Sequence, residues 1–154
     1  MKTKFLIQAA IIGAVYAVLT IGLSAVSYGP VQFRVSEALT VLPAFTPAAV
    51  PGLFTGCLVS NLLGPYGIVD AAAGSLATLL AAFLSYKFRK RQLLVPLPPV
   101  VANGVIIGAM LHYVYHVPNL LLCMGTVALG EGVICYAVGY PLIRLLNRYR
   151  GIFQ

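Results

Sequence analysis

Apolar segments separated by short turns make up most of this chain. They cover residues 5–26, 37–45, 48–63, 67–86, 93–115 and 120–146. A helix needs about 20 mostly apolar residues to cross the ~30 Å of hydrocarbon in a bilayer. Only 8% of the residues are charged, against about a quarter in soluble domains. The chain is therefore predicted to be an all-α membrane protein in which residues 1–154 form a single integral membrane domain, a compact bundle of six transmembrane helices.

Turn residues set the boundaries of these helices. Gly and Pro occur in every break between segments except the basic run at 87–91. The second segment is too short to cross a bilayer alone, and Pro43, Pro47 and Pro51 obscure the boundary between the second and third helices. The first segment is longer than the apolar region of a signal peptide and has no small-x-small cleavage site, so we expect a retained helix.

Basic residues indicate the orientation of the bundle. If the N-terminus is cytoplasmic, nine of the ten basic residues fall on the cytoplasmic side and Arg34 alone lies outside, as the positive-inside rule requires. Both termini and the loop at 87–91 are therefore expected in the cytoplasm, and residues 28–34 outside. This topology, with some affinity for anionic lipid, accounts for the net charge of +7, so we expect no nucleic-acid partner.

A few polar residues interrupt the apolar segments. An ionisable side chain within a span costs about 2.5–3.5 kcal/mol on insertion scales, so each must face protein, water or a ligand. In the predicted topology all of them fall in the outer half or at the midplane of the bundle, and they include all three carboxylates of the chain. This arrangement is typical of a solute pocket that opens outward. The set consists of Arg34, Glu37, Asn61, Asp70, Asn103, His112 and Glu131.

Most of these residues also have a purely structural explanation. Arg34 and Glu37, three residues apart, can pair with each other at the membrane surface. Asp70 can cap or flank the start of the fourth helix, and Asn103 can join two helices by a hydrogen bond. His112 lies nine residues after Asn103, about 180° around a straight helix, so the two share a pocket only if the helix bends or His112 faces a neighbouring helix.

Glu131 has the least structural reason to be where it is. It lies between Gly130 and Gly132 near the middle of the longest segment, and we expect it to have a function. The cysteines, Cys57, Cys123 and Cys135, are interpreted as small buried packing residues.

The sequence contains no recognisable catalytic motif. It has no phosphate-binding loop, no His/Cys metal cluster and no nucleophile elbow. We therefore expect neither an enzyme nor a bound cofactor or metal, and any uphill transport needs a partner or an ion gradient.

Three stretches resemble a known family. They are YGPVQFRVSEALTVLPAF, VPGLFTGCLVSNLLGPYGIVDAAAGSLATLLAAFLSY and LGEGVICYAVGYPLI, and they look like the QueT family, the queuosine-precursor substrate-binding (S) components of energy-coupling factor (ECF) transporters. The Arg-x-Ser-Glu-Ala-Leu element is the most specific part of this resemblance.

The resemblance implies a six-helix subunit in the bacterial plasma membrane. Such a subunit captures a 7-deazaguanine base, such as a prequeuosine base or queuine, from outside. It works with a shared transmembrane coupling subunit and two ATPase subunits, and topples in the membrane to release its solute. Three alternatives stay open: an S component for another nutrient or vitamin, an independent secondary transporter of a small solute, and a structural or regulatory membrane protein without a solute.

The implied substrate fits the polar residues chemically. A guanine-like edge presents a ring N–H and an exocyclic amine side by side, so one desolvated carboxylate can accept both; Glu131 and Glu37 are the candidates. An aminomethyl cation would need a second carboxylate such as Asp70. The ring carbonyl needs a donor, for which Asn103, His112 or Arg34 qualifies.

Aromatic residues and the segment after the first helix complete the predicted pocket. Tyr28, Tyr66 and Tyr113 are expected near the outer surface, where they would stack on the base or belong to the interfacial aromatic belt. We expect the segment that contains Pro30 and Glu37 to form an external gate.

Small residues on the first helix predict a close contact with another helix. Ala10, Ala14 and Ala17 lie on roughly one face with Gly13 beside them, a small-xxx-small pattern. Ala10 and Ala14 resemble the Ala-x-x-x-Ala element that S components present to the coupling subunit. Packing within the bundle is the alternative.

Overall fold

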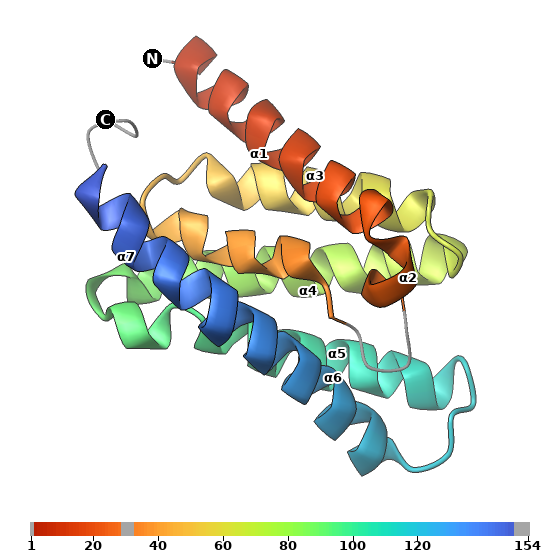
Figure 1. Ribbon diagram of the computed structural model, residues 1–154. Helices are drawn as coiled ribbons and strands as arrows, with labels where there is room; N and C mark the ends of the chain where they lie inside the picture. The colour runs from red at the N-terminus through yellow and green to blue at the C-terminus, as the bar shows by residue number, and fades with distance from the viewer. Residues whose placement is uncertain (1, 29–32, 150–154) are drawn as a thin grey trace.

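The computed structural model describes residues 2–28 and 33–149, and these residues form an all-helical bundle (Figure 1). This confirms the predicted all-α class. In chain order the elements are α1 (Lys2–Gly22), α2 (Ser24–Ser27), η1 (Val35–Ala44), α3 (Ala49–Leu62), α4 (Gly67–Lys87), η2 (Phe88–Lys90), η3 (Gln92–Leu94), α5 (Leu97–Tyr113), α6 (Leu120–Ile134), η4 (Cys135–Gly139) and α7 (Tyr140–Arg148).

Four helices of the described chain are long and apolar enough to cross a membrane. They are Lys2–Gly22, Gly67–Lys90, Gln92–Tyr113 and Leu120–Arg148, the last of which joins α6, η4 and α7. Two apolar helices are shorter, η1 and α3. At about 1.5 Å per residue, the 14 residues of α3 extend about 21 Å. That the two shorter helices also cross the membrane stays a prediction.

The helices run back and forth between two ends of the bundle (Figure 1). The start of α1, the end of α7 and the η2–η3 turn lie at one end, and the α3–α4 and α5–α6 turns lie at the other. Because η2 carries Arg89 and Lys90, basic residues gather at the end where the chain starts and finishes. This is the arrangement that the positive-inside argument requires.

The short helix η1 occupies the centre of the bundle. It contacts α1, α3, α4, α6, η4 and α7, and most of its residues are buried. It is a 3₁₀-helix of ten residues, whereas such helices seldom exceed about four. Since neighbouring helices enclose it, tertiary packing rather than local preference holds this conformation.

A π-helical turn breaks the last long helix beside η1. This turn, η4, ends at Gly139, where a Cβ atom would lie 3.1 Å from Cγ1 of Val41 and 3.4 Å from the carbonyl oxygen of Ala38. Both of these residues belong to η1. The wider turn and the missing side chain together let the last helix pass close to η1.

Glycines bring α1 and α3 into backbone contact. A Cβ atom on Gly56 would lie 2.5 Å from the carbonyl oxygen of Gly13, and one on Gly52 would lie 2.6 Å from that of Ala9. Gly13 is therefore buried inside the bundle, as the packing alternative predicted, while Ala10 and Ala14 on the same helix stay exposed.

Candidate functional site

The structure buries every carboxylate side chain of the protein in the bundle. Glu37 and Asp70 are 0% exposed and Glu131 is 2% exposed, and Arg34 beside them is also 2% exposed. Each would be costly to bury without a partner. We refer to these four residues, with Asn61 and Asn103, as the polar cluster.

Glu37 is held by donors from two other helices. The hydroxyl of Tyr16 on α1 donates to Oε1 of Glu37, and Oγ1 of Thr78 on α4 lies 3.4 Å from the same oxygen. The other oxygen, Oε2, is buried and has no hydrogen-bond partner in the described part of the chain. Oε1 of Glu37 is thus held by protein donors, and Oε2 can accept a hydrogen bond from a ligand or water.

Glu131 lies on α6, one turn before the π-helical segment. Its Oε2 is 3.8 Å from Sγ of Cys135, and the same sulfur is 3.7 Å from the backbone carbonyl oxygen of Glu37. The side chain of Asn103 on α5 faces both carboxylates. Its Nδ2 is buried and lacks a hydrogen-bond partner among residues 2–28 and 33–149. Two carboxylates and an amide from three elements therefore meet at one place.

Arg34 pairs with Asp70. Its Nη2 lies 3.4 Å from Oδ2 of Asp70, and its Nε donates to the backbone carbonyl oxygen of Ser27 at 3.4 Å. Nδ2 of Asn61 donates to the backbone carbonyl oxygen of Asp70 at 3.2 Å. The alternative in which Arg34 pairs with Glu37 is wrong, because η1 begins after Arg34 and the extended backbone there directs the guanidinium toward α4.

Three tyrosines form a linked group beside Arg34. The hydroxyl of Tyr66 donates to the carbonyl oxygen of Tyr28 at 2.9 Å, and that of Tyr115 donates to the carbonyl oxygen of Tyr66 at 3.0 Å. The hydroxyl of Tyr28 donates to the carbonyl oxygen of Ser60 at 2.7 Å, and the Arg34 guanidinium lies 5.4 Å from the centre of the Tyr28 ring. Two of the three tyrosines expected near the pocket, Tyr28 and Tyr66, thus border the polar cluster.

Two expected site residues lie elsewhere. Tyr113 is 67% exposed, and its ring stands edge-on to that of His112 with centroids 4.9 Å apart. Nδ1 of His112 lies 2.9 Å from the carbonyl oxygen of Val117. Because His112 lies nine residues after Asn103, about 180° around α5, it faces away from the carboxylates that Asn103 faces.

Sequence reasoning missed several polar neighbours of the cluster. Tyr16 and Thr20 lie one turn apart on the inner face of α1, where Tyr16 contacts Glu37 and Oγ1 of Thr20 lies 2.6 Å from Oγ of Ser36. Cys57 is buried, as predicted, but its Sγ also lies 3.3 Å from Oγ1 of Thr78. The available signal was the i, i+4 spacing of Tyr16 and Thr20 in an otherwise apolar helix.

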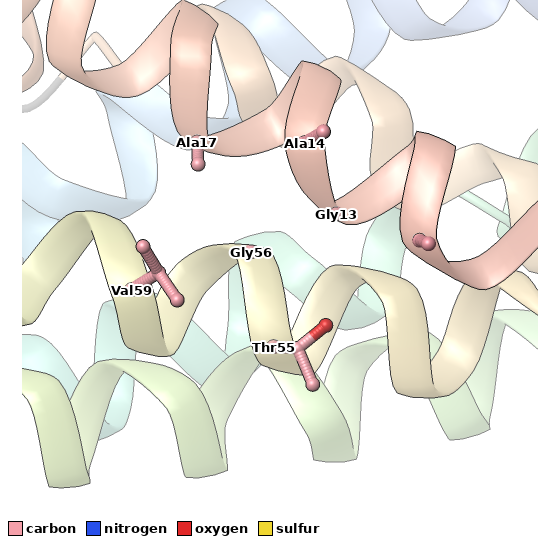
Figure 2. Close-up of a pocket in the computed structure, with 7 residues that line it drawn as sticks. Gly13, Ala14, Ala17, Thr55, Gly56 and Val59 are labelled. Atoms are coloured by element: carbon pink, nitrogen blue, oxygen red, sulfur yellow. The ribbon is translucent and has the colours of Figure 1, made fainter.

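A shallow groove of about 180 Å³ follows the outer side of the α1–α3 contact (Figure 2). Gly13 and Gly56 lie where the two helices approach each other. The groove is lined by Ala10, Gly13, Ala14, Ala17, Thr55, Gly56 and Val59. Its small side chains leave room for another helix to approach closely.

Comparison with known proteins identifies the family. The family model described as QueT transporter matches residues 6–148. The chain belongs to the QueT transporter family. The matched residues include the whole polar cluster, so the resemblance drawn from the three sequence stretches is confirmed over most of the chain.

A curated relative supports the same family. The protein named queuosine precursor transporter QueT of Lactococcus lactis subsp. cremoris (strain MG1363) is 44% identical over 86 residues, which cover 54% of this chain and 49% of that protein. The chain thus spans about half the length of the curated relative that it matches. No solved structure matches the chain.

The polar cluster of this QueT family member has unused hydrogen-bonding capacity. Oε2 of Glu37, Oδ1 of Asp70, Oδ1 of Asn61 and Nδ2 of Asn103 are buried without partners in the described residues. Such atoms are costly inside a protein and call for a ligand or water. No group of three or more His, Cys, Asp and Glu residues in the described chain is placed to hold a metal ion.

Proposed function

We propose that this chain is the substrate-capture subunit of an importer and binds a queuosine precursor, a 7-deazaguanine base, in the polar cluster. Support comes from the QueT family, from the name of the curated relative and from the geometry. The observation that carries the proposal is the buried meeting of Glu37, Glu131 and Asn103, in which a carboxylate oxygen and an amide nitrogen lack partners.

In this proposal Glu131 recognises the guanine-like edge. Its polar neighbours in the described chain are the weakly donating thiol of Cys135 at 3.8 Å and the amide of Asn103. Neither is charged, so the carboxylate can accept the ring N–H and the exocyclic amine together. Asn103 then donates to the ring carbonyl through Nδ2. Both side chains are already buried, so binding needs little further desolvation of the protein.

Arg34 and Asp70 would close the pocket on the outer side. Their ion pair and the three linked tyrosines Tyr28, Tyr66 and Tyr115 lie toward the end of the bundle opposite to the basic η2 turn. Under the positive-inside rule this end faces outward. The external gate predicted to include Pro30 lies partly outside the described residues.

We further propose that the α1–α3 groove docks a transmembrane coupling subunit that works with two ATPase subunits. The groove presents Ala10 and Ala14 as exposed small residues on a membrane-facing helix, a surface suited to close helix contact. Co-purification of the chain with such partners, and ATP-dependent uptake, would support this coupling. Uptake by the chain alone would instead identify a secondary transporter.

Calorimetry on the purified chain in detergent tests the binding proposal. A 7-deazaguanine base should bind with 1:1 stoichiometry, and Glu131→Gln should weaken it about tenfold or more, because the amide donates where the base also donates; tenfold corresponds to about 1.4 kcal/mol. His112→Gln is the matched control and should leave the affinity unchanged. Tighter binding of thiamine or another vitamin, or no binding of any base, would overturn the proposal.

A further inference from the structure

The buried charges of the bundle do not balance. The cluster holds three buried carboxylates and one guanidinium, and among the described residues Arg34 is the one buried basic side chain. The ion pair of Arg34 with Asp70 accounts for one charge of each sign. Beyond this pair, the groups that contact Glu37 and Glu131 are neutral: the hydroxyls of Tyr16 and Thr78, the thiol of Cys135 and the amide of Asn103.

Unbalanced carboxylates in a dry site require a compensating positive charge. The cost of burying a carboxylate without a counter-charge is so large that such groups are found paired or neutralised. A ligand that carries one cation would supply one of the two missing charges, and a bound proton is the alternative at either carboxylate.

The two carboxylates are suited to different parts of a ligand. Glu37 has Oε1 occupied by Tyr16 and Thr78, and its free Oε2 is fully buried. A single fixed oxygen suits a compact ammonium group, which acts as a point charge, better than a two-donor edge. The unpaired Nδ2 of Asn103, only 3% exposed, faces the same carboxylates; as a donor it calls for an acceptor such as the ring carbonyl, which leaves Oε2 of Glu37 for the ammonium.

We infer that Glu37 selects for a positive charge on the ligand, so that among bases with the same ring the one that carries an ammonium group binds best. This inference rests on the proposed function and deepens it. Asp70, the carboxylate that the sequence suggests for such a cation, is already neutralised by Arg34. Glu131 recognises the ring edge in either kind of base, and Glu37 distinguishes between them.

Two bases that differ in charge but share the ring system provide the test. The purified chain is titrated at pH 7 with 7-aminomethyl-7-deazaguanine, whose amine is protonated, and with 7-cyano-7-deazaguanine, which is neutral. The wild-type protein should bind the aminomethyl base at least tenfold more tightly, about 1.4 kcal/mol. Glu37→Gln should remove this preference by weakening the aminomethyl base while leaving the cyano base within about threefold.

Two further variants separate the roles. Glu37→Asp keeps the charge and should retain a preference for the aminomethyl base, whereas Glu131→Gln should weaken both bases alike. The wild-type comparison needs no variant, so a Glu37→Gln protein that fails to fold leaves the test in place. Equal wild-type affinity for the two bases would overturn the inference while the proposed function stands. Failure of both bases to bind would overturn the inference and the proposed function together.

Discussion

Removing the charge of Asp70 should destabilise the bundle strongly. Asp70→Asn keeps the shape of the side chain but leaves the Arg34 guanidinium, 2% exposed, without its counter-charge. Removing one partner of a buried ion pair lowers the free energy of unfolding by about 3–5 kcal/mol. For a chain of this size each kcal/mol shifts Tm by about 2–4 °C, so Tm should fall by about 6–20 °C.

Thermal unfolding of the purified protein in detergent, followed by circular dichroism, measures this effect. Arg148→Gln is the matched control, because it removes one charge from an exposed position and should change Tm by less than about 2 °C. The double variant Arg34→Met, Asp70→Leu should recover much of the loss, since apolar side chains of similar volume often replace a buried pair without cost. A Tm drop of less than about 2 °C for Asp70→Asn would show that the Arg34–Asp70 ion pair contributes little to the stability of the bundle.

Three further predictions concern topology, docking and packing. A cysteine placed at position 90 in a cysteine-free background should resist an impermeant thiol reagent in intact cells and react after lysis; labelling of intact cells would reverse the orientation. Ala10→Trp combined with Ala14→Trp should abolish co-purification with a coupling subunit while base binding persists. If the double variant still assembles, another face of the chain docks the coupling subunit. Gly56→Ala should lower Tm, because its Cβ would lie 2.5 Å from a backbone oxygen. Gly125→Ala is the control and should not lower Tm, because its Cβ would meet nothing within 4 Å. Equal effects of the two substitutions would show that the α1–α3 contact can adjust to a side chain.

The sequence allowed the helical segments and the meeting of the charged residues to be predicted. Both follow from the bilayer, which demands long apolar helices and makes each buried charge costly. The second apolar segment is too short to span a bilayer alone, and the structure has a ten-residue helix there. The gathering of Glu37, Asp70 and Glu131 is expected for the same reason, because an isolated carboxylate in hydrocarbon is energetically costly.

The partners of these residues were harder to predict. The i, i+3 spacing of Arg34 and Glu37 implies contact only if both lie in one helix, and η1 begins one residue after Arg34. For Tyr16 the one signal is its i, i+4 spacing from Thr20, and that signal is weak because tyrosine serves equally in a core and at an interface. The 3₁₀ and π conformations of η1 and η4 depend on how the two segments pack on each other, which no local pattern reveals.

A structure of the chain with 7-aminomethyl-7-deazaguanine bound would show directly whether the polar cluster holds the base. We expect the ring N–H and the exocyclic amine about 2.7–3.2 Å from the carboxylate oxygens of Glu131, with the ring carbonyl on Asn103 and the ammonium on Oε2 of Glu37. A base bound outside the polar cluster, with Glu37 and Glu131 still in contact only with protein, would contradict it.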